Sequence, residues 1–281
     1  MSFRDDLYYL LEKMNFTMLS DLQLQSHKLN RHVIFEIYKK CPRLKRLALC
    51  ATSLLNCDSV LGKIAVNLNQ LRELALECST RTSFLPLMAS LNYLNNLTTL
   101  SIHRCENITD ESISFLNIPF LTRLQIVQNR KISKVGLNDL FCHCIRLKDL
   151  TIRECIGVDD DAVDTICTCL PLLEKLDLSS SPTITLNSIR YIMNGLKYLK
   201  SLRLEDCQRI LVQWRSAPRY LCSLYALKSF YRAYPEFFYY NLPIEENDRY
   251  SDDYYYYYDS SSSYASTDGE DEFEDSSKLG N

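Results

Sequence analysis

Two short cysteine-rich segments are the first candidates for chemistry in this sequence. Cys142-His143-Cys144 and Cys167-Thr168-Cys169 offer thiol and imidazole ligands of the kind that zinc accepts. Residues i and i+2 of a helix point about 200° apart, so neither triplet can direct all of its ligands to one point. Cys144 and Cys167 also occupy positions where Leu or Met stands in related segments of the chain. We therefore predict buried, reduced structural thiols, with no metal and no cofactor.

The rest of the sequence contains few residues in patterns that are typical of catalytic sites. The sequence has no Gly-rich phosphate loop, nucleophile elbow or H-E-x-x-H motif, and its histidines are His27, His32, His103 and His143. His103 and Glu77 occupy equivalent positions in adjacent segments, but a solvated pair explains them as well as an acid–base pair does. We predict that the chain is not an enzyme.

Composition and charge indicate a globular body followed by an acidic tail. Of the 281 residues, 46% are hydrophobic and 24% are charged, as is typical of soluble globular proteins. Residues 1–244 carry 30 Lys+Arg against 23 Asp+Glu, a net charge of +7, whereas residues 245–281 carry 2 against 12, a net charge of −10. Because the tail would compete for basic groups, we expect no nucleic-acid partner. No apolar run reaches the ~18 residues of a membrane helix, so we expect no membrane association and a cytoplasmic or nuclear location.

An internal repeat sets the positions of all these residues. The pattern L-x-x-L-x-L-x-x-C/N has strong and weaker copies with spacings of 25, 27, 26, 24, 26, 26 and 26 residues, opening at Leu19, Leu44, Leu71, Leu97, Leu121, Leu147, Leu173 and Leu199. Alternating side chains within each copy, such as Leu100 and Ile102, predict a strand buried on one face. Before the next strand, apolar quartets at i, i+3, i+4 and i+7 predict a helix. Examples are Ile34/Ile37/Tyr38/Cys41, Leu61/Ile64/Ala65/Leu68, Leu137/Leu140/Phe141/Cys144, Val163/Ile166/Cys167/Leu170 and Ile189/Ile192/Met193/Leu196.

The end of each strand is marked eight residues after its opening leucine. The residue there is small or polar and able to bond the backbone of a tight turn, so we expect the chain to leave the strand at His27, Thr52, Ser79, Cys105, Asn129, Cys155, Ser181 and Cys207. One strand–turn–helix unit cannot bury its own apolar face, so the units must stack. The predicted fold is α/β, a curved solenoid with parallel strands on its concave face and helices on its convex face.

Three segments resemble the cysteine-containing class of leucine-rich repeat: CENITDESI (residues 105–113), CIGVDDDAV (155–163) and CPRLKRLAL (41–49). This class is best known from F-box/leucine-rich-repeat proteins, the substrate-recognition subunits of Skp-cullin-F-box (SCF) ubiquitin ligases, and from relatives that regulate mitotic exit. The resemblance covers about residues 5–210. It implies a protein that recognises a protein substrate for ubiquitin-dependent, proteasomal degradation. The alternative is a freestanding leucine-rich repeat scaffold or inhibitor without a ubiquitin-ligase role.

The F-box itself is not visible ahead of the repeats. Only eighteen residues precede the first predicted strand, too few for that helical domain. Leu7, Leu10, Leu11 and Met14 repeat the helical quartet, so we expect residues 1–18 to form a helical half-repeat or N-terminal cap. Either the chain is cut from a longer F-box protein, which would add the Skp adaptor as a partner, or the half-repeat is a natural cap.

The rest of the chain divides into three further parts. Eight repeats are predicted over residues 19–210. Residues 211–244 are rich in aromatic side chains and are predicted to cap the last apolar face, with an exposed aromatic docking site as the alternative. Residues 245–281 are acidic, rich in Tyr and Ser and poor in aliphatic side chains, so they are predicted to be a disordered tail.

Partner binding is expected at the outward strand positions, four and six residues after each opening leucine. These positions are richest in polar and charged types in the last five copies, and Arg is enriched among the residues that dominate protein interfaces. An ordinary solvated face is the alternative. The candidate partner-binding residues on the concave face are His103, Gln125, Arg153, Asp177, Arg203 and Glu205.

Overall fold

The computed structural model describes residues 13, 16–55, 58–78, 83–213 and 224–234. The chain divides into two compact units, Met1–Tyr240 and Asn241–Asn281, and all described residues lie in the first. The apolar quartet of the predicted N-terminal half-repeat and the whole predicted acidic tail lie outside the described residues.

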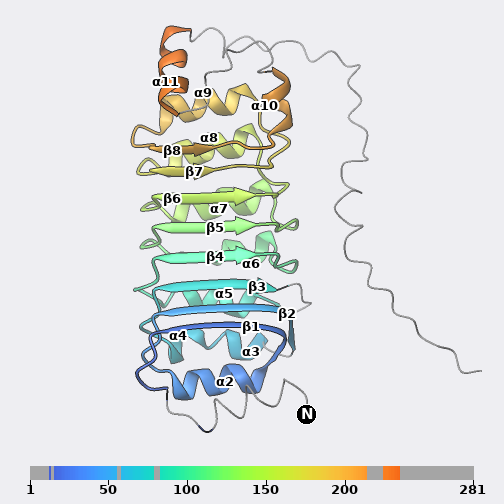
Figure 1. Cartoon of the computed structure of the whole chain (residues 1–281), viewed down its shortest axis with the longest axis vertical. Coiled ribbons are helices and arrows are strands. Elements are labelled where there is room, and N and C mark those ends of the chain that lie inside the picture. Colours follow the sequence, from blue (N-terminus) through green and yellow to red (C-terminus); the bar gives the residue numbers. More distant parts are fainter. Residues whose placement is uncertain (1–12, 14–15, 56–57, 79–82, 214–223, 235–281) are drawn as a thin grey trace, which may run out of the picture. The chain divides into compact units, whose positions relative to one another are not determined.

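Eight parallel strands form one sheet, and each strand pairs with its neighbours in sequence (Figure 1). Every strand begins two residues after a predicted opening leucine, which confirms the period of the repeat. We number the repeats by their strands. The strands are β1 (Asp21–Asn30), β2 (Arg46–Leu55), β3 (Glu73–Cys78), β4 (Thr99–His103), β5 (Arg123–Val127), β6 (Asp149–Arg153), β7 (Lys175–Asp177) and β8 (Ser201–Arg203).

Helices α2 to α9 cover one face of this sheet, as Figure 1 shows. The helices are α2 (Arg31–Lys40), α3 (Asp58–Leu61), α4 (Ile64–Asn67), α5 (Leu85–Leu91), α6 (Asp110–Ser114), α7 (Lys134–His143), α8 (Asp160–Cys169), α9 (Leu186–Gly195), α10 (Gln208–Gln213) and α11 (Leu224–Ala233). The repeating order of strand, turn and helix makes this a leucine-rich repeat solenoid of the α/β class. We call the opposite face of the sheet the strand face.

The core lies between the sheet and the helices. Leu100, Ile102, Leu150 and Ile152 are completely buried, while the residues between them are only partly so. Equivalent leucines of adjacent strands are in register, as in the pair Leu124 and Leu150. The five quartets supply the helical side of the core, and all their members except the partly exposed Met193 are buried. The predicted inward and outward registers of the strands are confirmed.

The turns after β4 to β8 share one geometry. The residue seven positions after each opening leucine has a positive φ: Arg104 (52°), Gln128 (56°), Glu154 (53°), Ser180 (59°) and Asp206 (57°). The next residue is buried in every case, and the Sγ of Cys105 lies 3.3 Å from the carbonyl oxygen of His103 and 3.7 Å from that of Leu76. The side chains of Cys105, Asn129, Cys155 and Cys207 contact the backbone at the turns of adjacent repeats, as predicted. The Oγ of Ser181 is buried without a hydrogen-bond partner among the described residues, so the prediction fails for that side chain.

Two predictions of local structure are wrong. β1 and β2 continue through His27 and Thr52 to Asn30 and Leu55, because the two strands pair with each other over almost their whole length. The segment around Leu61/Ile64/Ala65/Leu68 is not one helix but two short ones, α3 and α4, separated at Gly62 and Lys63. The backbone at Gly62 packs so close to α5 that an added Cβ would lie 2.7 Å from the Cβ of Pro86.

At the C-terminal end, α11 packs against the last repeat. Leu227 is buried, the Nζ of Lys228 donates to the carbonyl of Leu199 at 2.8 Å, and the Oη of Tyr231 hydrogen-bonds the Oδ1 of Asn194 at 3.0 Å. These contacts lie within the predicted cap, but its boundaries stay a prediction because residues 214–223 and 235–244 lie outside the described part. Of the helices that the structure describes, none is both long and apolar enough to cross a membrane.

Candidate protein-binding face

Two rows of outward side chains run along the strand face. The first row, four residues after each opening leucine, aligns Ser101, Gln125, Thr151, Asp177 and Arg203 on β4 to β8. The second row, two residues further on, aligns Glu77, His103, Val127 and Arg153 on β3 to β6. Short parallel strands in exact register thus place five of the six candidate residues in these rows. Glu205 follows the end of β8 and continues the second row in sequence only.

His103 ends β4 and is half-buried. Burial lowers its pKa and so does Arg104, while Glu77 and a hydrogen bond with Gln125 oppose the shift. The Oε1 of Gln125 also accepts a hydrogen bond from Ser101 at 3.1 Å. In the described part of the chain, the Nε2 of His103 is buried without a hydrogen-bond partner. The side chain is therefore a largely neutral imidazole with one ring nitrogen still able to bond.

Arg153 ends β6 and lies in the same row, with Val127 between it and His103. Its Nε is buried and has no hydrogen-bond partner among the described residues. A buried, unsatisfied N–H is rare in folded proteins, since it costs about 1–3 kcal/mol. Two polar nitrogens thus flank one apolar side chain on adjacent strands of the same face.

Asp177 and Arg203 form the charged end of the first row. The Oδ1 of Asp177 accepts from the backbone N and the Oγ of Ser179, at 3.0 and 2.6 Å, which fixes the carboxylate. Its Oδ2 lies 4.0 Å from the Nη1 of Arg203, whose side chain is 65% exposed against 13% for Asp177. The carboxylate of Asp177 is therefore fixed by hydrogen bonds, whereas the guanidinium of Arg203 contacts it only loosely and is mostly exposed.

The predicted mixed-charge cluster of Arg153, Asp177, Arg203 and Glu205 forms only in part. The Asp177–Arg203 pair is present, whereas no ion pair within the described residues joins Arg153 or Glu205 to the other two. Glu205 has an exposed side chain, and its backbone N donates to the Oγ of Ser179 at 3.2 Å. Whether these six residues bind a partner stays a prediction.

The structure adds a polar ladder that sequence reasoning missed. Arg104, in the turn after β4, lies 3.5 Å from Glu77 of β3 and donates to Gln128, after β5, at 2.5 Å. Gln128 donates in turn to Glu154, after β6, at 2.6 Å. Arg104, Gln128 and Glu154 are three of the residues with positive φ, and this conformation places their side chains beside one another. The shared position, seven residues after each opening leucine, was the available signal.

The other end of the strands also carries a surface that was not predicted. Arg123 and Lys175 flank Asp149 at 3.2 and 4.0 Å, and Lys148 and Lys200 flank Glu174 at 3.2 and 2.5 Å. The hydrogen bonds from Lys200 and then Lys148 lower the pKa of Glu174. All of these groups except Lys200 line a shallow depression of about 180 Å³. Exposed apolar side chains precede the same strands and recur at one repeat position: Phe120, Leu172 and Tyr198.

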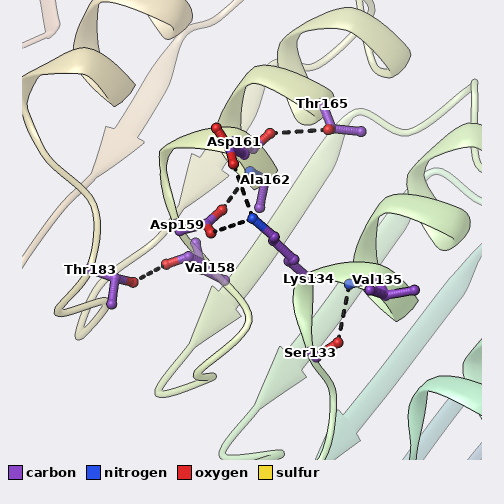
Figure 2. Close-up of polar contacts among 9 residues, drawn as sticks. All are labelled: Ser133, Lys134, Val135, Val158, Asp159, Asp161, Ala162, Thr165 and Thr183. Atoms are coloured by element: carbon purple, nitrogen blue, oxygen red, sulfur yellow. Dashed lines mark hydrogen bonds and ion pairs between the residues drawn. The ribbon is translucent and has the colours of Figure 1, made fainter.

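The helix side shows how neighbouring repeats are fixed to one another. In Figure 2 the Nζ of Lys134, on α7, reaches Asp159 and Asp161 of the next repeat, at 3.2 and 3.0 Å. These hydrogen bonds, the one to Asp161 first, raise the pKa of Lys134. The Oγ1 of Thr183 donates to the carbonyl of Val158 in the same view.

A second set of contacts repeats every other helix. Asp110, at the start of α6, accepts from the backbone N and Oγ of Ser133 at 2.7 and 2.6 Å. Asp160, at the start of α8, accepts from the backbone N and Oγ1 of Thr185 at 2.8 and 2.6 Å. Ser133 and Thr185 are the N-caps of the next helices, α7 and α9. Each aspartate therefore holds the cap of the following repeat and so helps to position the strands.

The cysteine triplets do not form a metal centre in the described structure, where no group of three or more His, Cys, Asp or Glu side chains is placed to hold an ion. Cys144 and Cys167 are buried, and burial raises the pKa of each thiol to about 12. The prediction of burial is wrong for the other two thiols, because Cys142 is exposed and Cys169 is half-buried. Cys142 thus points outward, whereas Cys169 packs partly against the core.

No family model matches the chain. Three solved structures are similar to it over 72% of its length, and none is more than 18% identical. A chain in the crystal structure of the yeast Rad7–Elc1 complex is 16% identical with a TM-score of 0.48, and 60% of that chain is covered. Internalin C2 and internalin InlF of Listeria monocytogenes are 18% and 15% identical, with TM-scores of 0.45 and 0.40 and with 82% and 68% of those chains covered. The assignment as a leucine-rich repeat protein rests on this chain's own geometry, eight parallel strands in register, each with its buried leucines, turn and helix.

Proposed function

We propose that the strand face of repeats four to eight binds a protein partner. The observation that carries this proposal is the unsatisfied Nε of Arg153, which lies in one row with His103 and Val127. If the Arg153 side chain shifts when a partner binds, an acceptor on the partner can bond this N–H and remove its cost, while the partner covers the apolar side chain between the two polar ones. Recognition, not catalysis, is the role that such a surface supports.

The partner chemistry that fits best is an acidic segment with exposed acceptors. Arg153 offers a donor, Arg203 extends a mostly exposed guanidinium, and the neutral imidazole of His103 adds no competing charge. Arginine binds carboxylates through paired, charge-assisted hydrogen bonds, which gives such a contact direction as well as energy. The carboxylate of Asp177 lies beside the guanidinium of Arg203, so it would repel an acidic group that a partner placed directly next to Asp177.

The wider role that we propose is substrate recognition for an SCF-type ubiquitin ligase in the cytoplasm or nucleus. The support for it is the resemblance of residues 41–49, 105–113 and 155–163 to the cysteine-containing repeats of F-box proteins. In that role an F-box encoded upstream of Met1 would add the Skp adaptor as a second partner. A freestanding scaffold or inhibitor is the competing proposal, and it needs the same strand face but no adaptor.

A comparison of two triple-site variants tests the binding face. Partners of the tagged chain are purified from cells that express the wild type, the variant R153A/D177A/R203A, or a control, K134A/D161A/D164A, which removes exposed charges on the helix side. We expect the strand-face variant to lose a partner that the wild type and the control retain, with all three proteins folded by circular dichroism. Equal recovery with all three would refute the proposed face.

A second experiment separates the ligase role from the scaffold role. Transcripts are sequenced upstream of Met1, and the encoded full chain is tested for direct binding to the Skp adaptor. If it is a ligase subunit, its depletion should lengthen the half-life of the partner that requires Arg153 and Arg203. A partner whose half-life does not change, together with no adaptor binding, supports the scaffold or inhibitor.

A further inference from the structure

Two cysteines of adjacent repeats face one another on the helix side. Cys142 is the second-last residue of α7, Cys169 is the last residue of α8, and their sulfurs are 3.1 Å apart. Cys142 is exposed and Cys169 is half-buried, so a small reagent in solution can reach the pair. Neither side chain takes part in the strand face or in the contacts between the aspartates and the helix caps.

We infer that Cys142 and Cys169 form a modification site, a dithiol that oxidants of the disulfide class convert into an inter-repeat disulfide. Sulfur atoms in a disulfide are about 2.05 Å apart, so closing the bond needs an approach of about 1 Å. Rotation of two side chains at the surface can provide a movement of this size. The inference does not depend on the proposed function of the strand face.

The environment of the pair assigns a role to each thiol. The pKa of Cys169 is raised to about 11, first by burial and then by its hydrogen bond with Cys142. Cys169 therefore keeps its proton at neutral pH, and either sulfur of the pair can donate in the contact between them. The exposed Cys142 is then the thiol that meets an incoming oxidant, and Cys169 is the thiol that resolves the product.

With oxidised glutathione as the oxidant, the reaction proceeds in two exchanges. Cys142 loses its proton to solvent, and its thiolate attacks one sulfur of glutathione disulfide, which breaks that S–S bond and releases one glutathione thiolate. Cys169 then loses its proton to solvent and attacks the sulfur of Cys142 in the mixed disulfide. The second glutathione leaves as a thiolate, so two protein thiols are oxidised and one glutathione disulfide is reduced to two glutathiones.

The neighbouring cysteines are poor competitors in this reaction. Cys144 and Cys167 lie two residues from the pair, but both are buried and protonated, with pKa values raised to about 12. The turn residues Cys105, Cys155 and Cys207 are buried as well. Cys50 is half-buried, and burial followed by the charge of Glu77 raises its pKa. Selectivity therefore comes from access together with the adjacent resolving thiol.

The disulfide would tie α7 to α8, the helices next to the strands that carry Arg153 and Asp177. It would close a chain segment from residue 142 to residue 169, and a cross-link of this length restricts the unfolded chain strongly. We expect oxidation to make these two repeats unfold at a higher temperature. The side chains of the strand face take no part in the disulfide and should stay unchanged.

Peptide mapping of the full chain tests the inference. The reduced protein is incubated with glutathione disulfide, free thiols are alkylated under denaturing conditions, and the protein is cleaved with trypsin. We expect a disulfide between the peptides spanning residues 135–146 and 154–175, placed at Cys142 and Cys169 by fragmentation, with Cys144, Cys155 and Cys167 alkylated. The unfolding temperature should rise by about 5 °C or more and return on reduction.

Three matched variants complete the test. C142S should abolish the disulfide, and C169S should leave one stable glutathione adduct on Cys142, because the resolving thiol is gone. C50S should behave as the wild type does. Two independent glutathione adducts on the wild type, a disulfide that uses Cys144 or Cys167 instead, or an unfolding temperature that oxidation raises equally in C142S would each overturn the inference.

Discussion

At the scale of single residues, the buried turn positions decide how one repeat joins the next. Asn129 is completely buried and makes three hydrogen bonds: its Oδ1 accepts from the N of Cys105 at 2.9 Å, and its Nδ2 donates to the carbonyls of Ile102 and Val127 at 2.9 and 2.8 Å. Cysteines do the same work in neighbouring repeats at longer range, with Cys155 Sγ 3.3 Å from the carbonyl of Arg153 and 3.7 Å from that of Ile126. An amide thus forms the stronger version of a contact that a thiol forms weakly.

Replacement of Asn129 should therefore show a graded cost. N129A leaves one N–H and two carbonyls of the turn without this partner, and we expect it to lower the free energy of unfolding by about 2–4 kcal/mol. N129C installs the side chain that sister repeats use and should cost about half as much. Denaturant unfolding of both variants measures the difference. If N129A costs no more than the exposed-site control D164A, the amide does not have this role.

His103 should make stability depend on pH. Burial is the chief cause that lowers the pKa of His103 below the ordinary 6.5 of a histidine, so the native protein binds fewer protons at this site than the unfolded chain does just below pH 6.5. The stability that the neutral His103 contributes is then fully present above pH 6.5. It is lost as the pH falls from 6.5 through the lowered pKa of His103 in the native protein. We expect unfolding free energies measured from about pH 7.5 to about pH 5.5 to fall less steeply for H103Q than for the wild type. Parallel curves would contradict this assignment.

At the scale of elements, aspartates at the start of α8 provide a matched comparison. Asp160 accepts from the backbone N and Oγ1 of Thr185 and also from the Oγ of Ser188, so it fixes the start of α9. Asp161 stands next to it in the same helical turn, but its side chain is 77% exposed and, within the described residues, pairs with Lys134 alone (Figure 2). We expect D160A to cost about 2–4 kcal/mol and D161A about 0–1 kcal/mol in equilibrium unfolding. If the two variants lose similar free energies of unfolding, the negative charge at the start of α8 accounts for the effect and the hydrogen bonds of Asp160 do not.

The strand register is tested at Leu150, the second residue of β6, which is completely buried. L150A removes most of a core side chain from between the sheet and the helices, and we expect it to cost about 2–5 kcal/mol. Its outward neighbour Thr151 lies on the strand face, so T151A should have a small effect. Thermal or denaturant unfolding compares the two variants, and a reversed order of costs would contradict the register.

Much of the element arrangement could be predicted from sequence because strands and helices repeat with fixed apolar periods. The leucines of each strand and the quartets of α2, α7, α8 and α9 carry that signal directly. The positive φ of Arg104, Gln128 and Glu154 could not be predicted in the same way, since none of these residues is the glycine that usually marks such a conformation. The ladder of side chains at these turns was missed for the same reason.

The candidate site was less predictable than the fold. Period two predicted which residues face outward, but not which of them pair, because pairing depends on side-chain reach and burial. Sequence reasoning grouped Arg153 with Asp177 and Arg203, whereas the structure pairs only the last two and leaves the Nε of Arg153 without a described partner. The approach of Cys142 to Cys169 likewise depends on two helices in different repeats, and no local pattern reports it.

At the scale of the whole molecule, the fold distributes polar groups over two different layers. On the helix side, Asp110 and Asp160 bond neighbouring caps, although the Oδ1 of Asn138 on α7 is buried without a partner among the described residues. The strand face leaves donors of Arg153 and His103 unused within the described structure. In a solenoid each repeat contacts only its neighbours, so stability accumulates along the helix side while the strand face remains available for a partner.

The two parts of the chain carry net charges of opposite sign. Residues 1–244 carry a net charge of +7 and residues 245–281 a net charge of −10, and the latter lie outside the described residues, so the prediction rests on charge alone. An acidic segment on the same chain can compete with an acidic partner for Arg153 and Arg203, and phosphorylation of Thr267 would add about −1.5 to −2 further charges to it. The alternative is that the acidic segment only aids solubility, since salt at ~0.15 M screens exposed charges beyond ~8 Å.

Deletion of residues 245–281 distinguishes these two roles. If the acidic segment competes, the shortened chain should bind its partner more tightly at low salt, and the gain should shrink as salt is raised because both interactions are then screened. Titration calorimetry of the two chains across a salt series measures this, with R153A/R203A in both backgrounds as the control for the site of competition. An affinity and a salt dependence that deletion leaves unchanged would exclude competition and leave the solubility role.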